Sequence, residues 1–197
     1  MNFAGIRAVL FDAGDTLIAY RRPLRILLQD FFIAHDIIVT RDVIAETLDA
    51  VNPRYRSLVD RIRTVEDERR MWLEVARDFL DLAVPRHRDL YPALAEWFAG
   101  SWRHLKVFRD ARPALRALRT GGLRLAVVSN WEPSLEQTLE HLGLREYFEA
   151  VIVSSVEGVW KPDPALFGLA LQRLQLAADL AASVGDNLER DVRSADT

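Results

Sequence analysis

The stretch Ile6-Arg-Ala-Val-Leu-Phe-Asp12-Ala-Gly-Asp-Thr16 decides the fold of this chain. Its first six residues favour a β-strand, and the apolar run stops abruptly at Asp12. A short apolar run that ends in turn-forming residues is typical of a buried strand. We therefore predict a strand at 6–11 that carries the carboxylates of Asp12 and Asp15 at its C-terminal end.

Further along the chain, three more apolar runs have the same form. They predict strands at 123–128, 151–154 and 181–184, and a helix precedes the first of them at 111–120. Strands that alternate with helices are typical of a parallel sheet covered by helices. The predicted fold class is therefore α/β, and ligands of such sheets bind beyond the carboxyl ends of the strands.

A long segment of different character interrupts this alternation between about residues 21 and 105. Its apolar residues recur at spacings of one, three and four, which is the period of amphipathic helices. One example is the run Met71, Trp72, Val75, Phe79 and Leu82. We predict an all-helical insertion of about four helices in this segment.

Composition limits the classes of function. The 197 residues are 50% hydrophobic and 28% charged, which is enough apolar material for a core. A net charge of −3 provides no general attraction for nucleic acids or anionic membranes, and no apolar run approaches the roughly 20 residues of a membrane span. The chain has no cysteine, which excludes disulfides and thiolate nucleophiles. We expect a cytoplasmic protein without nucleic-acid or membrane partners. A homo-oligomer is possible.

Polar clusters stand directly after the predicted strands or between them. They lie at 12–16, 129–130, 161–163 and 185–191. Because the carboxyl ends of parallel strands meet at one edge of a sheet, we expect these clusters to form one site. Crowded carboxylates resist ionising together unless a cation lies among them, and hard oxygen ligands suit Mg²⁺. The sequence therefore predicts a magnesium site.

In their order along the chain, these motifs resemble the haloacid dehalogenase-like (HAD) hydrolase superfamily. They are Asp12-x-x-x-Thr16, Ser129-Asn130, Lys161-Pro162 and Gly185-Asp186-x-x-x-x-Asp191. The resemblance covers the whole chain and implies a Rossmann-like α/β core at 1–17 and 107–197. The helical insertion, at 18–106, is similar to the C1 cap of subfamily IA. The implied activity is that of a phosphatase with a small phosphorylated metabolite as substrate.

The resemblance also implies roles for single residues. Asp12 would be the nucleophile that accepts the phosphoryl group as an aspartyl-phosphate. Ser129 would donate a hydrogen bond to a phosphoryl oxygen, with Asn130 beside it, and Lys161 would neutralise negative charge. The implied Mg²⁺ ligands are Asp12, the backbone carbonyl of Gly14, and Asp186, with Asp191 binding the ion or lying directly behind its ligands.

One position departs from the family pattern. The residue two after the nucleophile is normally an aspartate that acts as general acid and base, whereas this chain has Gly14 followed by Asp15. In the first of three interpretations, Asp15, a cap residue or a good leaving group compensates. In the second, the chain is a dehalogenase, which lacks that aspartate and needs no metal. In the third, catalysis is impaired and the domain binds a phosphorylated ligand or a protein. The retained Asp186 and Asp191 favour the phosphatase.

The sequence stops at Thr197, a few residues after the last motif. Relatives in the family continue with another helical turn and a fifth strand. We therefore expect the strand near 181–185 to form an exposed sheet edge, which is prone to pair with other chains. We favour the interpretation that the sequence is a fragment of a longer protein. The alternative is that another subunit covers this sheet edge.

Overall fold

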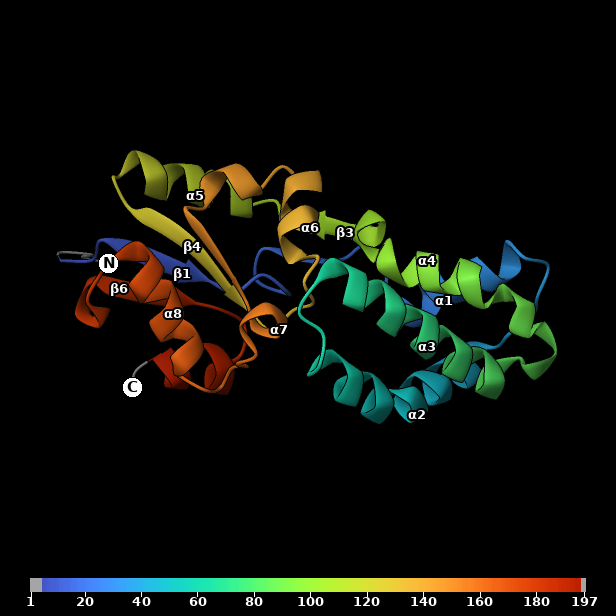
Figure 1. The fold of residues 1–197 in the computed structure, drawn as a ribbon. Coiled ribbons are helices and arrows are strands. Elements are labelled where there is room, and N and C mark those ends of the chain that lie inside the picture. The colour runs from blue at the N-terminus through green and yellow to red at the C-terminus, as the bar shows by residue number, and fades with distance from the viewer. Residues whose placement is uncertain (1–4, 196–197) are drawn as a thin grey trace. The chain divides into compact units, whose positions relative to one another are not determined.

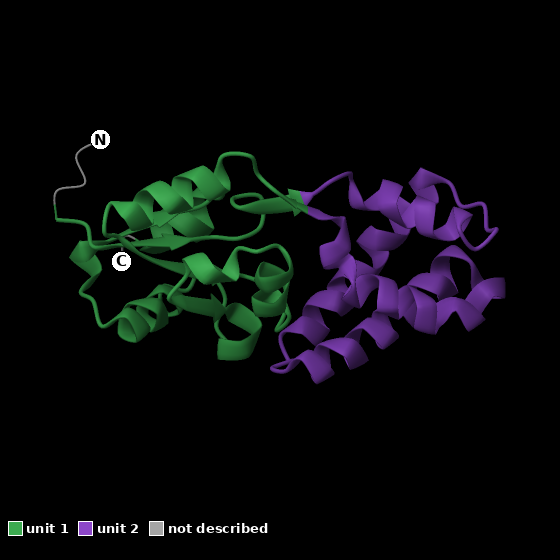
Figure 2. Ribbon diagram, turned by 90° about the horizontal axis from the view of Figure 1, so that it is seen from above, with its two compact units in different colours: residues 1–19, 106–197 green, residues 20–105 purple. Residues whose placement is uncertain are grey.

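The computed structural model describes residues 5–195, and the chain divides into two compact units (Figure 2). Unit 1 comprises residues 1–19 and 106–197, and unit 2 comprises residues 20–105. The two boundaries fall within or beside the short strands β2 (Ile18–Tyr20) and β3 (Leu105–Val107), which pair with each other. None of the helices within 5–195 is long and apolar enough to span a membrane.

A parallel sheet of four strands forms the centre of unit 1, in the order β5-β4-β1-β6. The strands are β1 (Ala8–Phe11), β4 (Arg124–Ser129), β5 (Ala150–Val153) and β6 (Ala181–Val184). β1 is buried along its whole length and β4 along nearly all of it, as expected for strands of a parallel sheet covered on both faces. The predicted α/β fold is confirmed, and each strand lies within two residues of its predicted range.

Helices cover both faces of this sheet (Figure 1). They are α5 (Ala111–Thr120), α6 (Leu135–His141), α7 (Ser154–Glu157) and α8 (Ala165–Leu174). Figure 1 shows α5 and α8 on opposite faces. Leu166 and Leu174 of α8 are fully buried in one cluster with Leu10 and Val128 of the sheet. Short helical turns complete the unit at Arg145–Tyr147, Ala178–Leu180, Leu188–Val192 and Arg193–Ala195.

The register of the sheet brings the carboxyl ends of three strands level. Phe11 of β1 is the partner of Val127 in β4 and of Val184 in β6. The next backbone N–H, that of Asp12, donates to the carbonyl oxygen of Val184 at 2.9 Å. Residues that directly follow the three strands therefore lie at one edge, although the residue after β1 is more than a hundred positions from the other two in the sequence. β6 is an edge strand of the sheet.

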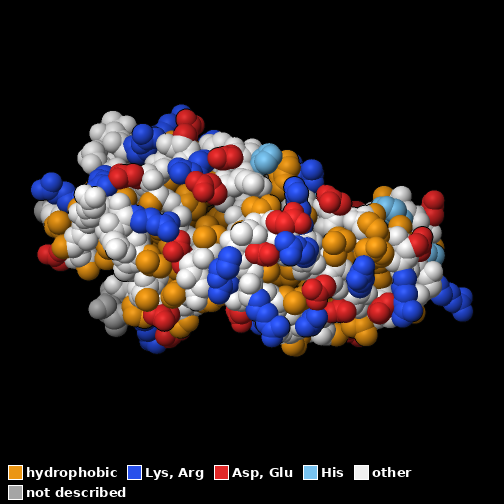
Figure 3. Space-filling model, viewed as in Figure 1, with side chains coloured by type: hydrophobic (Ala, Val, Ile, Leu, Met, Phe, Trp, Pro, Cys, Tyr) orange, Lys and Arg blue, Asp and Glu red, His pale blue; other side chains and the backbone are white. Residues whose placement is uncertain are grey.

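Unit 2 is built from four main helices, which confirms the predicted all-helical insertion. They are α1 (Leu24–Ile33), α2 (Arg41–Val59), α3 (Val65–Ala83) and α4 (Tyr91–Ala99), with short 3₁₀ turns at Pro85–Leu90 and Ser101–His104. Acidic and basic side chains intermingle on the face of this unit seen in Figure 3. Arg54 of α2, for example, pairs with Glu74 and Asp78 of α3. Arg54 thus forms exposed ion pairs with acids of the neighbouring helix.

Aromatic side chains fill the core of unit 2, and Phe79 lies at its centre. The Phe79 side chain is fully buried, and its ring centroid lies 6.1 Å from that of Phe32 and 6.4 Å from that of Phe98. Phe79→Ala is expected to lower the free energy of unfolding of unit 2 by about 3–5 kcal/mol, because it leaves a cavity. Leu82→Ala is the control on the same helix. Leu82 is 58% exposed, and its truncation should lower the free energy of unfolding by less than about 0.5 kcal/mol. Equal decreases for the two variants in denaturant unfolding would contradict this packing.

Candidate active site

A small cavity lies at the carboxyl edge of the sheet in unit 1, with a volume of about 170 Å³. It is lined by Asp12, Gly14, Asp15, Ser129, Asn130, Trp131, Lys161, Asp186, Arg190 and Asp191. All the site residues predicted from the sequence are in this set. Pockets for drug-sized ligands measure about 300–1,000 Å³, so this cavity suits a smaller group such as a phosphoryl anion.

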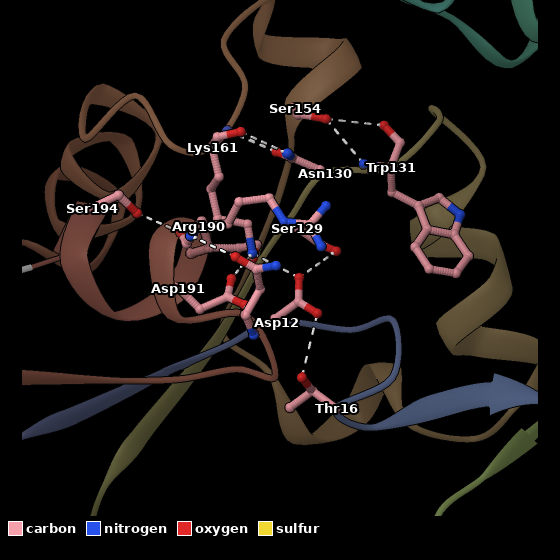
Figure 4. Close-up of polar contacts among 12 residues, drawn as sticks. Asp12, Thr16, Ser129, Asn130, Trp131, Ser154, Lys161, Arg190, Asp191 and Ser194 are labelled. Carbon is pink, nitrogen blue, oxygen red and sulfur yellow. Dashed lines mark hydrogen bonds and ion pairs between the residues drawn. The ribbon is translucent and has the colours of Figure 1, made fainter. Parts of the chain in front are cut away.

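Lys161 is the central cation of the cavity (Figure 4). Its side-chain Nζ donates to Asp12 Oδ1 at 2.7 Å, to Asp191 Oδ1 at 2.5 Å and to the carbonyl oxygen of Val128 at 2.9 Å. These three bonds use all the donors of an ammonium group. The Lys161 and Asp191 side chains are each only 2% exposed. The ammonium is therefore fixed between two carboxylates and largely shielded from water.

The carboxylate of Asp12 accepts hydrogen bonds from three side chains. Oδ1 accepts from the hydroxyl of Ser129 at 3.0 Å as well as from Lys161, and Oδ2 accepts from the hydroxyl of Thr16 at 3.4 Å. Burial raises the pKa of Asp12, and the charge and hydrogen bond of Lys161 oppose that rise. A further cation in the cavity would favour the ionised form that a nucleophile needs.

The side chain of Asn130 is engaged with the backbone of Lys161. Its Nδ2 donates to the carbonyl oxygen of Lys161 at 2.9 Å, and the backbone N–H of Lys161 donates to Asn130 Oδ1 at 2.8 Å. This reciprocal pair joins the end of β4 to the segment that carries the lysine. The structure thus assigns Asn130 a positioning role, while Ser129 is the neighbour that contacts Asp12 directly.

Three carboxylates of the cavity could hold a cation. One oxygen each of Asp12, Asp186 and Asp191 lies within 4.8 Å of the other two. Both oxygens of Asp191 already accept hydrogen bonds, Oδ1 from Lys161 and Oδ2 from the backbone N–H of Asn187 at 2.9 Å. Asp186 is exposed and forms no hydrogen bond or ion pair within residues 5–195. Carboxylate oxygens of this kind fit Mg²⁺. Asp186 is fully available to such an ion, and Oδ2 of Asp12 accepts only the long 3.4 Å bond from Thr16.

The loop after β6 depends on a glycine. A Cβ atom on Gly185 would lie 2.3 Å from Cγ of Asp191, which is too close for any other residue. The side chain of Asn187 accepts a hydrogen bond from the backbone N–H of Arg190 at 3.0 Å and so caps the turn at 188–192. These two features fold the loop back so that Asp191 reaches Lys161.

Two residues that line the cavity were not predicted, Trp131 and Arg190. Each is a direct neighbour of a predicted residue, since Trp131 follows Asn130 and Arg190 precedes Asp191. Their position next to a predicted site residue was the only indication in the sequence that they line the cavity. The direction of a side chain in a loop depends on backbone angles that residue patterns do not specify.

The ring of Trp131 lies close to the backbone of position 14. A Cβ atom on Gly14 would lie 3.1 Å from Cζ3 of Trp131, a tight contact. The backbone of Trp131 is anchored to α7, because its N–H donates to Ser154 Oγ at 3.0 Å and its carbonyl accepts from Ser155 at 3.3 Å. The ring thus takes up the space in which a side chain at position 14 would begin. Asp15 is exposed and has left-handed backbone geometry, with φ of 56°.

This complementarity predicts a coupling between positions 14 and 131. Gly14→Ala is expected to destabilise unit 1 by about 1 kcal/mol, because the added methyl overpacks the contact with Trp131. In a Trp131→Ala background the same substitution should be nearly neutral. Denaturant unfolding of the two single variants and the double variant measures the coupling energy. Strictly additive effects would show that the ring does not restrict position 14.

Comparison with known proteins identifies the class to which this fold and cavity belong. Residues 6–196 match the family model of haloacid dehalogenase-like hydrolases. The chain belongs to this family and is a hydrolase, as the sequence predicted.

Relatives with curated names include phosphatases. Haloacid dehalogenase-like hydrolase domain-containing protein 3 of Homo sapiens is 33% identical over 190 residues, which cover 92% of this chain and 74% of that protein. Glyceraldehyde 3-phosphate phosphatase of Methanopyrus kandleri is 28% identical over 199 residues, covering 96% of this chain and 79% of that protein. The solved structure of a HAD phosphatase from Thermococcus onnurineus has a TM-score of 0.58 and 26% identity, covering 97% of this chain and 82% of its own.

Proposed function

We propose that this chain is an Mg²⁺-dependent phosphatase that transfers the phosphoryl group of a small phosphorylated metabolite first to Asp12 and then to water. The observation that carries the proposal is the Asp12 carboxylate, which is bonded to Lys161 and Ser129 and opens into a small cavity with Asp186. The similarity to two phosphatases supports it.

The reaction has two displacements at phosphorus. In the first, a carboxylate oxygen of Asp12 forms a bond to phosphorus while the bond to the leaving oxygen breaks, and the leaving oxygen takes a proton from water or from Asp15. In the second, water attacks the phosphorus of the aspartyl-phosphate, loses a proton, and releases inorganic phosphate together with the Asp12 carboxylate. A covalent intermediate of this kind divides one difficult displacement into two easier ones.

The other polar groups of the cavity would offset the negative charge of Asp12 and of the phosphoryl group. The ammonium of Lys161 offsets negative charge on Asp12 and on the transferring group, and the hydroxyl of Ser129 can turn from Asp12 to a phosphoryl oxygen. Asp12 and Asp186 would hold Mg²⁺, with the Gly14 carbonyl at the same cavity and Asp191 behind them. When bound, the ion supplies a Lewis acid that neutralises phosphoryl oxygens.

We also propose that unit 2, residues 20–105, serves as the cap over this site. Closure of such a unit excludes water during the transfer step. A capped site admits small metabolites in preference to macromolecules. The absence of cysteine and the net charge of −3 fit a cytoplasmic enzyme without nucleic-acid or membrane partners.

Hydrolysis of para-nitrophenyl phosphate tests this function. Turnover is expected with Mg²⁺ and is expected to stop when a chelator is added. The same preparation should release no halide from a 2-haloacid. Halide release without metal would show that the chain is a dehalogenase and not a phosphatase. Binding of phosphorylated ligands without any turnover would indicate a binding domain, and either result overturns the proposal.

A further inference from the structure

A cavity larger than the one at Asp12 lies within unit 2, and the proposed function does not use it. Its volume is about 470 Å³, and pockets for small molecules measure about 300–1,000 Å³. It lies at α3, the 3₁₀ turn Pro85–Leu90 and the start of α4, and it is lined by Arg77, Leu80, Asp81, Arg88, Asp89 and Tyr91. No residue of the 3₁₀ turn is buried, so the turn does not fill this space with apolar side chains. The cavity therefore has room for a whole small metabolite.

Arg77 supplies this cavity with a cation that is held in place but has no anionic partner. Its guanidinium carbon lies 4.4 Å from the centroid of the Tyr91 ring, a cation–π contact. Such a contact engages the face of the ring and occupies none of the five N–H donors of the guanidinium. Among residues 5–195, these donors form no hydrogen bond or ion pair. Arg77 therefore offers a positioned pair of N–H donors, which suits a carboxylate.

The other charged side chains of the lining determine which anion fits. Arg88 forms an ion pair with Asp81, so these two charges offset each other. Asp89 is exposed and has no hydrogen bond or ion pair within the described part of the chain. A dianion such as phosphate would meet one uncommitted cation and one uncommitted carboxylate, and the carboxylate would repel it. A molecule with one negative and one positive group meets an opposite charge for each of them.

We propose that this cavity of unit 2 binds a free amino acid with an apolar side chain. Arg77 binds the carboxylate, Asp89 binds the ammonium group, and the apolar side chain packs against Leu80, which is fully buried beneath the cavity. The cavity shares no residue with the cavity at Asp12, so the amino acid is an effector and not the substrate. The inference does not depend on the proposed phosphatase function.

The test uses L-leucine and two analogues that each lack one of its charges. Isothermal titration of the full chain with L-leucine should show saturable binding with a Kd of about 1 mM or lower. Binding should be at least about 5-fold weaker for 4-methylpentanoate, which lacks the ammonium group, and for 3-methylbutylamine, which lacks the carboxylate. Inorganic phosphate should not displace L-leucine. Arg77→Gln is expected to raise the Kd for L-leucine by about 10- to 100-fold, as for a lost charged hydrogen bond.

Arg86→Gln is the matched control, because Arg86 is an exposed arginine of the same 3₁₀ turn and does not line the cavity. It should leave the Kd for L-leucine unchanged. Asp89→Asn should weaken the binding of L-leucine without weakening that of 4-methylpentanoate, and denaturant unfolding verifies that each variant is folded. The inference is overturned if L-leucine does not bind saturably, or if Arg77→Gln and Arg86→Gln have equal effects. It is also overturned if either analogue binds as tightly as L-leucine, or if phosphate displaces it. Hydrolysis of para-nitrophenyl phosphate is a separate readout, so failure of this inference leaves the phosphatase function intact.

Discussion

Asp12→Asn is expected to abolish phosphatase turnover, with a fall in kcat of at least about 10⁴-fold, because the amide cannot form the covalent intermediate. The fold should survive. Asparagine has nearly the same size as aspartate, and Lys161 keeps Asp191 and the Val128 carbonyl as acceptors. Steady-state hydrolysis of para-nitrophenyl phosphate with Mg²⁺ measures the effect, and denaturant unfolding verifies that the variant is folded.

The matched control is Asp179→Asn, an exposed aspartate in the same unit. It should retain the full rate. If folded Asp12→Asn kept more than about one hundredth of the rate, Asp12 could not be the nucleophile.

The second large effect concerns stability. Lys161→Met is expected to lower the free energy of unfolding of unit 1 by about 3–5 kcal/mol, because it leaves the buried carboxylate of Asp191 beside Asp12 without a cation. Turnover should be lost as well. Denaturant unfolding, followed separately for the two units, gives the change.

A double variant separates the charge from the packing. Lys161→Met combined with Asp191→Asn should recover a large part of the lost stability, because the buried unpaired charge is gone, while turnover stays absent. Arg193→Gln, which breaks an exposed ion pair with Glu189, should lower the free energy of unfolding by less than about 1 kcal/mol. If Lys161→Met lowered it by no more than Arg193→Gln does, Lys161 would not stabilise the site.

The convergence of the site could be predicted because it follows from topology. Asp12 and Ser129 directly follow or end apolar runs that alternate with helices, and parallel strands place such residues at one edge. Asp186 obeys the same rule at the end of β6. The helical insertion was equally visible, because its apolar residues repeat with the helical period.

The finer geometry could not be predicted from these patterns. The amide of Asn130 holds the backbone of Lys161, a contact that no residue pattern indicated. The directions of Trp131 and Arg190 depend on loop conformation, and loops carry no periodic signal. The space that Trp131 takes from position 14 is a property of packing between segments more than a hundred residues apart, which no local pattern encodes.

The most direct test of the central claim is to find the phosphoryl group on the chain. The protein is mixed with Mg²⁺ and an aryl phosphate, quenched in acid during turnover and digested, and the peptides are weighed by mass spectrometry. The peptide that contains Asp12 is expected to carry the mass of one phosphoryl group, and this mass should be absent with chelator and in Asp12→Asn. Sustained turnover with the phosphoryl group on a different residue would contradict the account.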